Sequence, residues 1–450
     1  MAGIFKAYDI RGTYPDQVNE EIAFQVGYWY RDLLDEEDLA RGPVVVVSRD
    51  MRAHSESLAG ALKAGLRARG IAVLDIRLAD TPMNYFAIGH LGASGGIQVT
   101  ASHNPAKYNG FKMSRRDAIP VSRDTGIARL EELVRASTVS SGLPPEAGEE
   151  RRDVFAAYSD HVIGHLEASE PRLKVAADAA NGMGTTYRPI LDRMNIELVP
   201  LFFELDGSFP NHEANPLKPE NLVDLEAAVR REGCDFGVAF DGDGDRAMFI
   251  DETGRAIPAD KITGLLAPRF IRSQPGAPIV YDLRSSWSTK EAIEEAGGRA
   301  VRERVGHSFM KATMRKLDSP FGGELAGHFY YRSNYTADSS LITVVQILNE
   351  LRERGQRLSE LVAPLFRYSA TGEINFRVDD KEAMIRRLAE LFSDGEIDYL
   401  DGITVQYADW WFNVRPSNTE PLLRLVLEAR TPELMEAKKV RLLEVLGDPV

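Results

Sequence analysis

Short apolar runs alternate with amphipathic segments along most of the chain. Residues 43–47 form an apolar, β-branched run, and apolar side chains then recur at helical spacing over residues 56–69. A buried strand followed by an amphipathic helix is the repeating unit of mostly parallel sheets. Strands predicted at residues 71–76 and 96–100 complete a first α/β unit, which ends near Val134.

The same alternation predicts two more α/β units and a smaller C-terminal domain. The second unit has predicted helices over residues 154–166, 185–194 and 221–232 and predicted strands over residues 174–177, 197–203 and 236–240. The third has a predicted strand over residues 278–281 and predicted helices over residues 289–296 and 339–352. The C-terminal part has predicted strands over residues 374–378, 403–407, 411–414 and 422–428, a helix over residues 381–391 and a final helix.

The predicted fold class is therefore α/β, with three similar domains of mixed, mostly parallel sheets and a smaller C-terminal α+β domain around a central cleft. A length of 450 residues suggests roughly three domains at about 150 residues each, and the pattern raises this number to four. Residues 136–152 are rich in Ser, Gly, Pro and Glu without periodicity, which is typical of a linker. We predict domains at residues 1–145, 146–254, 255–368 and 369–450.

Composition and charge narrow the function classes. With 68 acidic and 54 basic side chains, the formal net charge is −14, which argues against binding nucleic acid or an anionic membrane surface. Cys234 is the single cysteine, so no internal disulfide can form. No apolar run approaches the ~18 residues of a membrane span, and Asp9 and Arg11 interrupt the N-terminus too early for a signal peptide. We expect a cytoplasmic protein.

Three carboxylates stand at alternate positions between two predicted strands, at Asp241, Asp243 and Asp245. Like charges at this density repel one another unless a cation lies among them, and hard oxygen ligands select Mg²⁺ or Ca²⁺. An EF-hand loop is excluded because its sixth position, a glycine, is Arg246 here and the flanking segments read as strands rather than helices. A solvated acidic turn is the alternative to a metal site.

A second loop, residues 100–105, follows a predicted strand at the end where α/β proteins place ligands. The Ser102 hydroxyl suits a nucleophile or a phosphoryl carrier, and Lys112 is near enough in sequence to transfer a proton or to neutralise a phosphate. The alternative is an ordinary turn that Ser102 caps and Asn104 initiates before Pro105.

Two further loops carry polar side chains between glycines or prolines. In residues 322–328, Glu324 and His328 offer contacts to hydroxyl groups, although such a loop can be purely structural. In residues 415–421, Arg415 precedes Ser, Asn and Thr, which together suit an anion such as phosphate; a solvated surface turn is the alternative. The four loops fall one in each predicted domain, which predicts a shared cleft.

Together with residues 6–12 and 48–52, these loops in this order resemble the α-D-phosphohexomutase family, most closely its bacterial phosphomannomutase/phosphoglucomutase branch. The resemblance covers nearly the whole chain. It implies an isomerase that interconverts hexose 1-phosphate and hexose 6-phosphate (mannose and/or glucose) through a phosphoserine and a 1,6-bisphosphate. It also implies Mg²⁺, a hexose 1,6-bisphosphate as activator and intermediate, phosphosugars as the partners, and a monomer or small homo-oligomer.

The resemblance carries functional roles to individual residues. Phosphorylation would fall on Ser102, and the implied Mg²⁺ ligands are Ser102, Asp241, Asp243 and Asp245. The implied catalytic residues are Ser102, Arg11, Lys112, Arg246 and His307. The implied substrate-binding residues are Tyr8, Arg284, Gly306, Lys311, Glu324, His328, Arg415, Ser417, Asn418 and Thr419.

The chain departs from the family pattern at two positions. Ala326 stands where the family usually has Ser, so one hydrogen bond to sugar or phosphate, worth on the order of 1 kcal/mol, is either missing or supplied by another group. Arg284 stands where the family often has Lys, and arginine does not accept a proton, so His307 and Lys311 are the alternative acid/base groups. Phosphoglucosamine mutase is the main rival, disfavoured by Asn418; a Mg²⁺-dependent sugar phosphatase and a non-catalytic sugar-phosphate binder are the others.

The acidity of the chain does not exclude small phosphates. The predicted cleft gathers the basic residues Arg11, Lys112, Arg246, Arg284, Lys311 and Arg415. We expect a local positive field there to attract phosphosugars while the exterior stays acidic.

Overall fold

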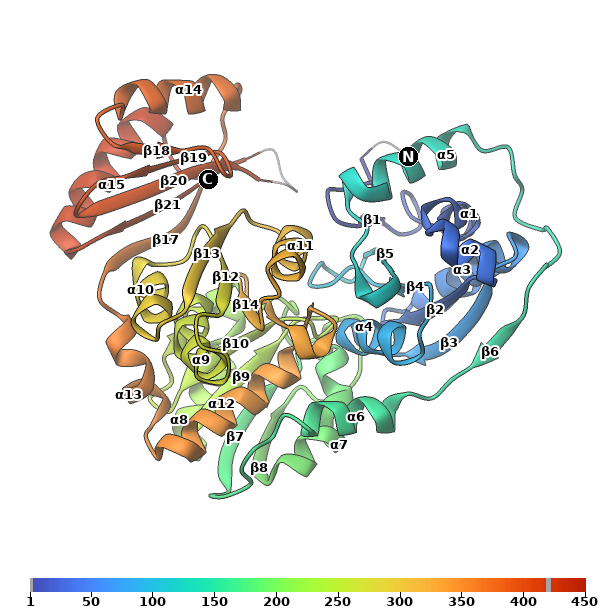
Figure 1. Cartoon of the computed structure of the whole chain (residues 1–450), viewed down its shortest axis with the longest axis horizontal. Helices are drawn as coiled ribbons and strands as arrows, with labels where there is room; N and C mark the ends of the chain where they lie inside the picture. The colour runs from blue at the N-terminus through green and yellow to red at the C-terminus, as the bar shows by residue number, and fades with distance from the viewer. Residues whose placement is uncertain (1–2, 418–421) are drawn as a thin grey trace. The chain divides into compact units, whose positions relative to one another are not determined.

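The chain folds into two compact units in a computed structural model that describes residues 3–417 and 422–450 (Figure 1). The first unit comprises Met1–Ala259 with Ala326–Ser359, and the second comprises Asp260–Leu325 with Glu360–Val450. The third α/β domain therefore contributes segments to both units.

The first domain is built on a six-stranded sheet. Its strands are β1 (Ile10–Thr13), β2 (Val44–Arg49), β3 (Ala72–Leu78), β4 (Gly95–Val99), β5 (Tyr108–Arg115) and β6 (Glu149–Arg151). Its helices are α1 (Glu20–Tyr30), α2 (Glu36–Arg41), α3 (Ser55–Ala68), α4 (Thr81–His90) and α5 (Ala128–Ala136). The strand order is β1-β5-β4-β2-β3-β6, with β1 and β5 antiparallel to their neighbours and the others parallel. The predicted linker thus contains β6, which pairs with β3 of this sheet.

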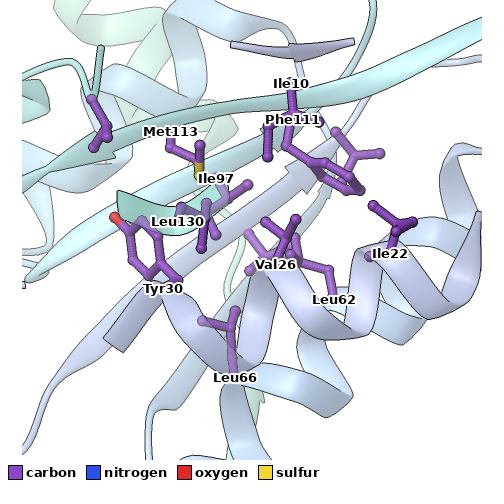
Figure 2. Packing of buried hydrophobic residues seen from close by; sticks show 14 of the residues in the cluster. Ile10, Ile22, Val26, Tyr30, Leu62, Leu66, Ile97, Phe111, Met113 and Leu130 are labelled. Carbon is purple, nitrogen blue, oxygen red and sulfur yellow. The ribbon is translucent and has the colours of Figure 1, made fainter. Parts of the chain in front are cut away.

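One face of this sheet is covered by α1, α3 and α5 (Figure 2). Apolar side chains such as Val26 of α1 and Leu62 of α3 lie against Ile97 and Phe111 of the sheet. The two helices approach closely because a Cβ on Gly65 would lie only 2.1 Å from the Phe24 carbonyl oxygen. This packing fixes the strands whose ends carry the serine loop.

The second domain has a five-stranded sheet in the order β11-β10-β9-β7-β8. Its elements are α6 (Phe155–Ile163), β7 (Leu173–Asp178), α7 (Arg188–Leu191), β8 (Ile196–Leu201), α8 (Val223–Glu232), β9 (Phe236–Phe240), β10 (Ala247–Asp251) and β11 (Ala256–Ile257). The predicted continuous helix over residues 185–194 is wrong: 3₁₀ turns flank the single turn of α7. Pro189 has no N–H and lies at the start of α7, where its missing donor is not needed, whereas the predicted helix would place it in the second turn.

The third domain supplies β12 (Pro278–Asp282), β13 (Arg299–Glu303), β14 (Phe321–Gly323), β15 (Phe329–Tyr331) and β16 (Ala337–Asp338). Its helices are α9 (Ala259–Ser273), α10 (Trp287–Glu295), α11 (His307–Leu317), α12 (Ser340–Arg354) and α13 (Leu358–Val362). In the second unit β12 pairs in parallel with β13 and β14, and in the first unit β15 pairs antiparallel with β16.

The C-terminal domain is an antiparallel sheet in the order β17-β21-β20-β19-β18 with two helices. Its elements are β17 (Ser369–Phe376), α14 (Lys381–Leu391), β18 (Glu396–Asp398), β19 (Ile403–Gln406), β20 (Trp410–Pro416), β21 (Leu423–Ala429) and α15 (Pro432–Leu446). Leu388 of α14 and Leu442 of α15 belong to one buried cluster with the sheet.

The predicted fold class, three mixed α/β domains and a smaller α+β domain, is confirmed. No helix in the described part of the chain is long and apolar enough to cross a membrane.

Candidate active site

Ser102 lies in the loop that follows β4, at the end of the strand where the sequence places it. Its side chain is buried, and its backbone has the left-handed φ of +52° that non-glycine residues seldom adopt. The Ser102 N–H donates to Thr100 Oγ1 (2.9 Å), and its hydroxyl donates to Asp241 Oδ2 (3.1 Å) and lies 3.1 Å from His103 Nδ1. Tertiary folding thus brings the serine loop to the acidic loop.

The acidic loop connects β9 to β10, so both of its flanks are strands and an EF-hand is excluded. Asp241, Asp243 and Asp245 are each no more than 1% exposed, which also excludes a solvated turn. One oxygen from each carboxylate lies within 4.8 Å of the others. Three carboxylates so close together in a buried site are an oxygen donor set for a hard cation.

Among the described residues, hydrogen bonds reach only one of the two carboxylate oxygens of Asp243 and only one of those of Asp245. Lys112 Nζ donates to Asp243 Oδ2 (2.6 Å) and to Asp245 Oδ2 (2.5 Å), and Thr81 Oγ1 also donates to Asp243 Oδ2 (2.5 Å). Among the described residues, the buried Oδ1 atoms of Asp243 and Asp245 have no hydrogen-bond partner. Buried anionic oxygens left unpaired are costly, so these residues fit a divalent cation that binds through them.

The charges of this cluster are distributed unevenly. Burial and the neighbouring charges of Asp245 and Asp243 raise the pKa of Asp241 well above its usual range. Burial opposes the charged form of Asp243, but the Lys112 ammonium outweighs it and lowers the pKa of that carboxyl. Burial likewise opposes the charge on Lys112, but Asp243 and Asp245 raise its pKa well above its usual range. Lys112 therefore stays cationic.

Two arginines and a histidine adjoin the serine loop. Arg11, on β1, donates to Asn104 Oδ1 (2.5 Å) and pairs with Asp9, and Tyr8 lies just before this strand. The Arg246 N–H donates to Asp241 Oδ1 (3.2 Å). Burial and the charges of Arg246 and Arg11 lower the pKa of His103 well below its usual range, so this imidazole is neutral beside the Ser102 hydroxyl.

Sequence reasoning missed Asp80, which caps α4 next to the acidic loop. Its Oδ1 accepts from the Met83 N–H (2.7 Å), and the neighbouring Thr81 N–H donates to the Asp243 carbonyl (3.0 Å). Burial, reinforced by the charges of Asp243 and Asp245, raises the pKa of Asp80 from 3.8 to about 8.

Replacing Asp80 by Asn should stabilise the metal-free protein more at pH 8 than at pH 5. Folded wild type keeps a proton on Asp80 that the unfolded chain has released, so its stability falls as the pH rises from 3.8 to about 8. Asp80→Asn keeps the cap without this slope, and we expect a gain of roughly 2–4 kcal/mol at pH 8, measured by urea unfolding in EDTA. The matched control is Asp380→Asn, an exposed cap that accepts from the Ala383 N–H (2.9 Å). An equal gain at both pH values for Asp80→Asn would contradict the assignment.

His328 lies in the first unit beside the acidic loop. Its Nδ1 contacts Asp338 Oδ2 (2.7 Å) and is 3.8 Å from Asp245 Oδ1. The preceding Gly327 carbonyl accepts from the Ala247 N–H (3.0 Å), which ties this loop to β10. Asp338, which orients the His328 ring, carries no motif in the sequence.

The second unit gathers a separate basic cluster around Glu373 on β17. Glu373 Oε2 accepts from Arg415 Nη2 (2.7 Å) and is 3.6 Å from Arg284 Nη1, while Glu373 Oε1 is 3.2 Å from Arg424 Nη1. Arg284 is also held by Asp282 Oδ2 (2.6 Å), and although burial opposes its charge, Asp282 raises its pKa. Burial and the charge of Arg284 lower the pKa of Arg415.

Arg415 is only 1% exposed, and its Nε has no hydrogen-bond partner among the described residues. A buried guanidinium with an unused N–H, beside a second arginine, suits an anion. Ser417 is also buried, just after β20. Asn418 and Thr419 lie outside the described residues.

The other predicted residues of the second unit lie in the predicted sugar loop and at the start of α11. Glu324 Oε1 accepts from the Gly306 N–H (2.9 Å), which joins the predicted sugar loop to the start of α11. His307 begins α11, and Lys311 is fully buried one turn further along. Asp282 also accepts from the Leu325 N–H (2.8 Å), so one carboxylate organises both Arg284 and the loop of Glu324.

The predicted residues thus form two groups, one in each unit. The group in the first unit contains Ser102, Arg11, Lys112, the three aspartates, Arg246 and His328. The group in the second unit contains Arg284, Gly306, Glu324 and Arg415. The buried serine and acidic triad of the first unit, and the paired arginines of the second, are each the kind of site that suits a phosphorylated ligand.

Comparison with known proteins identifies the class of the protein. The chain matches four successive family models of "Phosphoglucomutase/phosphomannomutase": alpha/beta/alpha domains I, II and III at residues 2–139, 156–254 and 258–368, and the C-terminal domain at residues 373–445. The chain belongs to the phosphoglucomutase/phosphomannomutase family. It is an isomerase of the phosphohexose mutase type.

Individual relatives are similar in sequence to this chain over almost their whole length. A protein of Xanthomonas campestris pv. campestris named "Phosphohexose mutases" is 43% identical, covering 95% of both chains. A phosphomannomutase of Escherichia coli K12 is 38% identical, covering 99% of both. A solved phosphoglucomutase/phosphomannomutase family protein from Burkholderia thailandensis is 33% identical with a TM-score of 0.89, covering 98% of this chain and 96% of that one.

A more distant structure shares the fold alone. N-acetylphosphoglucosamine mutase of Aspergillus fumigatus, solved in complex with GlcNAc-6P and magnesium, is 14% identical with a TM-score of 0.58, covering 92% of this chain and 85% of that one.

Proposed function

We propose that the chain interconverts hexose 1-phosphate and hexose 6-phosphate by way of phospho-Ser102 and a hexose 1,6-bisphosphate. The observation that carries this proposal is the Ser102 hydroxyl, 3.1 Å from Asp241 Oδ2, in a triad where the Oδ1 atoms of Asp243 and Asp245 have no hydrogen-bond partner among the described residues. A phosphoryl carrier needs a site that stabilises negative charge on the group in transfer.

The residues of the first unit have distinct roles in this proposal. Ser102 Oγ carries the phosphoryl group, and Arg11, Lys112 and Arg246 hold its oxygens. Mg²⁺ bound by Asp241, Asp243 and Asp245 would neutralise charge on the phosphoryl group during transfer. His328, oriented by Asp338, binds a sugar hydroxyl.

The residues of the second unit bind the part of the substrate that does not react. Arg284 and Arg415 bind the other phosphate, which takes the place of the Glu373 carboxylate as their anionic partner. The predicted residues Ser417, Asn418 and Thr419 add neutral donors. Glu324 and the Gly306 backbone recognise ring hydroxyls. Tyr8, His307 and Lys311 remain predicted substrate or proton-transfer groups.

Intact mass tests the covalent step. After incubation with Mg²⁺ and glucose 1,6-bisphosphate, we expect one stable phosphoryl group per chain, which peptide mapping locates on Ser102. Release of inorganic phosphate at the rate of bisphosphate consumption, with no hexose monophosphate isomerised, would instead identify a sugar phosphatase.

The substrate is proposed to be mannose phosphate, glucose phosphate or both. Relatives at 38% to 43% identity bear the names phosphomannomutase and phosphohexose mutase, which supports this choice. The test is kcat/KM for mannose 1-phosphate, glucose 1-phosphate and glucosamine 1-phosphate. A clear preference for the amino sugar would identify a phosphoglucosamine mutase.

Replacing Arg415 by Ala should raise KM by about 10–100-fold, the loss expected for a charged hydrogen bond, and lower kcat much less. The reason is that Arg415 would bind a phosphate equally in the ground state and the transition state. The control is Arg430→Ala, an exposed arginine of the same domain whose side chain donates to the Ala408 carbonyl (3.1 Å). A large loss of kcat at unchanged KM for Arg415→Ala would contradict the role.

A further inference from the structure

One buried side chain, that of Arg52, donates hydrogen bonds to three carbonyls of the serine loop and to one at the start of β5. The Arg52 guanidinium donates to the carbonyl oxygens of Ser102 (2.9 Å), Asn104 (2.6 Å), Pro105 (2.9 Å) and Tyr108 (3.2 Å). Arg52 is 2% exposed. A single side chain that donates to four separate carbonyls needs several N–H groups in fixed directions. Among side chains, only the planar guanidinium of arginine carries enough of them.

The guanidinium is itself fixed by the segment that follows β2. Asp50 Oδ2 accepts from Arg52 Nε (3.1 Å), while Asp50 Oδ1 accepts from the Arg52 N–H (3.1 Å) and from Ser55 Oγ (2.5 Å). The Phe209 ring lies against the guanidinium, 5.1 Å from its central carbon. The strand end, the carboxylate and the arginine therefore form one rigid support beneath the serine loop.

The serine loop needs such a support because its backbone conformation is unfavourable by itself. Ser102 has a φ of +52°, and a non-glycine residue keeps such a conformation only where the surrounding structure imposes it. Its carbonyl oxygen lies between Arg52 and the acidic loop, where a Cβ on Gly242 would be only 2.4 Å away. This fixed carbonyl determines where the Ser102 hydroxyl points, toward Asp241.

We propose that Arg52 is a positioning residue for phosphoryl transfer: by holding three carbonyls of the serine loop and the Tyr108 carbonyl at the start of β5, it keeps Ser102 Oγ in line with the reacting phosphate. Within the described part of the chain, Arg52 donates its hydrogen bonds to these carbonyls and to Asp50 rather than to the hydroxyl or the acidic triad, so it acts through the backbone. The inference rests on the proposed role of Ser102 and extends it to the part of the structure that fixes its geometry.

The chain offers a matched control for this residue. Arg352, 7% exposed in α12, donates to the carbonyls of Pro171 (3.0 Å), Ala168 (2.8 Å), Met194 (2.8 Å) and Asn195 (3.0 Å). These four carbonyls belong to the segments that precede β7 and β8 of the second domain, and none belongs to the serine loop. Arg52→Lys and Arg352→Lys therefore remove the same kind of buried fork with the same number of carbonyl acceptors, and only the first bears on Ser102.

The experiment compares both variants with wild type in kcat, KM, thermal stability and the rate at which dephosphorylated enzyme takes a phosphoryl group from glucose 1,6-bisphosphate, followed by intact mass. For Arg52→Lys we expect kcat and the phosphorylation rate to fall on the order of 10²-fold, as a misplacement of about 1 Å produces, with KM within about twofold. For Arg352→Lys we expect a comparable loss of thermal stability and rates within about twofold of wild type.

A milder variant covers the case in which Arg52→Lys folds poorly. Asp50→Asn keeps the shape of the support but removes the charge that holds the guanidinium, and we expect a smaller fall of both rates in the same direction. Equal rates for the arginine pair, or a loss of stability in Asp50→Asn with unchanged rates, would overturn the proposal. Either result would leave the proposed function standing, because that function is tested separately by phosphoryl uptake on wild-type Ser102.

Discussion

Ser102→Ala should abolish mutase activity, with kcat lowered on the order of 10⁴-fold or more, as removal of a covalent nucleophile does. The substitution deletes one buried oxygen whose hydrogen bond goes to Asp241 Oδ2 (3.1 Å). The chain should still fold, because Arg52 holds the loop through its backbone. The measurement is the rate of mannose 1-phosphate isomerisation with added bisphosphate, together with intact mass.

The control is Ser94→Ala, at the opposite end of β4. Ser94 is also buried, and its Oγ accepts from the Val44 N–H (3.2 Å), remote from the acidic loop. We expect this variant to retain wild-type kcat and to lose only a little stability. Full mutase activity in Ser102→Ala would show that the phosphoryl group travels by another route, and the proposed mechanism would then be wrong.

The sequence predicts those parts of the molecule whose signal is local. The acidic loop is recognisable because three carboxylates within five residues, between two apolar strands, repel one another strongly unless a cation binds among them. Strand and helix patterns fix the α/β order because each element needs one apolar face or run. The one failed helix, over residues 185–194, contains Pro189, whose effect depends on where the helix begins.

The residues that sequence reasoning missed act across long separations. Glu373 is one acid among many in the sequence, and it becomes the centre of three arginines only because β17 pairs with β21 and Arg424 pairs with Arg415 across β20 and β21. Asp338 likewise gains meaning from its contact with His328. Such roles depend on strand register and loop closure, which short-range patterns do not encode.

The same contrast separates Arg52 from Arg352. Both are arginines near the end of a regular element, and nothing in the neighbouring sequence distinguishes a support for the serine loop from a support for other loops. The difference arises from which carbonyls lie within reach after folding. A sequence motif therefore predicts candidate reactive groups better than it predicts the residues that position those groups.

Lys112→Met should lower kcat on the order of 10³-fold and make the stability of the protein depend strongly on Mg²⁺. Lys112 Nζ is the donor shared by Asp243 Oδ2 (2.6 Å) and Asp245 Oδ2 (2.5 Å). Without the Lys112 ammonium, the buried carboxylates of Asp243 and Asp245 lose the positive charge that offsets their repulsion. This loss lowers the free energy of unfolding by several kcal/mol. Charge stabilisation of a transferring phosphoryl group weakens by about this much when one fixed cation is removed.

The structure predicts that Lys112→Met affects kcat without preventing Mg²⁺ from binding. Because Lys112 binds the Oδ2 atoms and leaves both Oδ1 atoms unpaired among the described residues, it does not compete with a cation, and Mg²⁺ should still bind. We therefore expect the melting temperature to be well below that of wild type in EDTA and to recover with Mg²⁺ by more than the wild type gains, while kcat stays low.

The matched control is Lys63→Met. Lys63 Nζ also joins two carboxylates, Asp75 (2.6 Å) and Glu149 (2.7 Å), and is similarly buried, with 16% of its side chain exposed against 12% for Lys112. Its variant should lose stability without any Mg²⁺ dependence and keep its kcat. If Lys112→Met and Lys63→Met responded to Mg²⁺ alike, the acidic triad would not be the metal site, since the two lysines differ chiefly in whether the carboxylates they join have buried oxygens to spare.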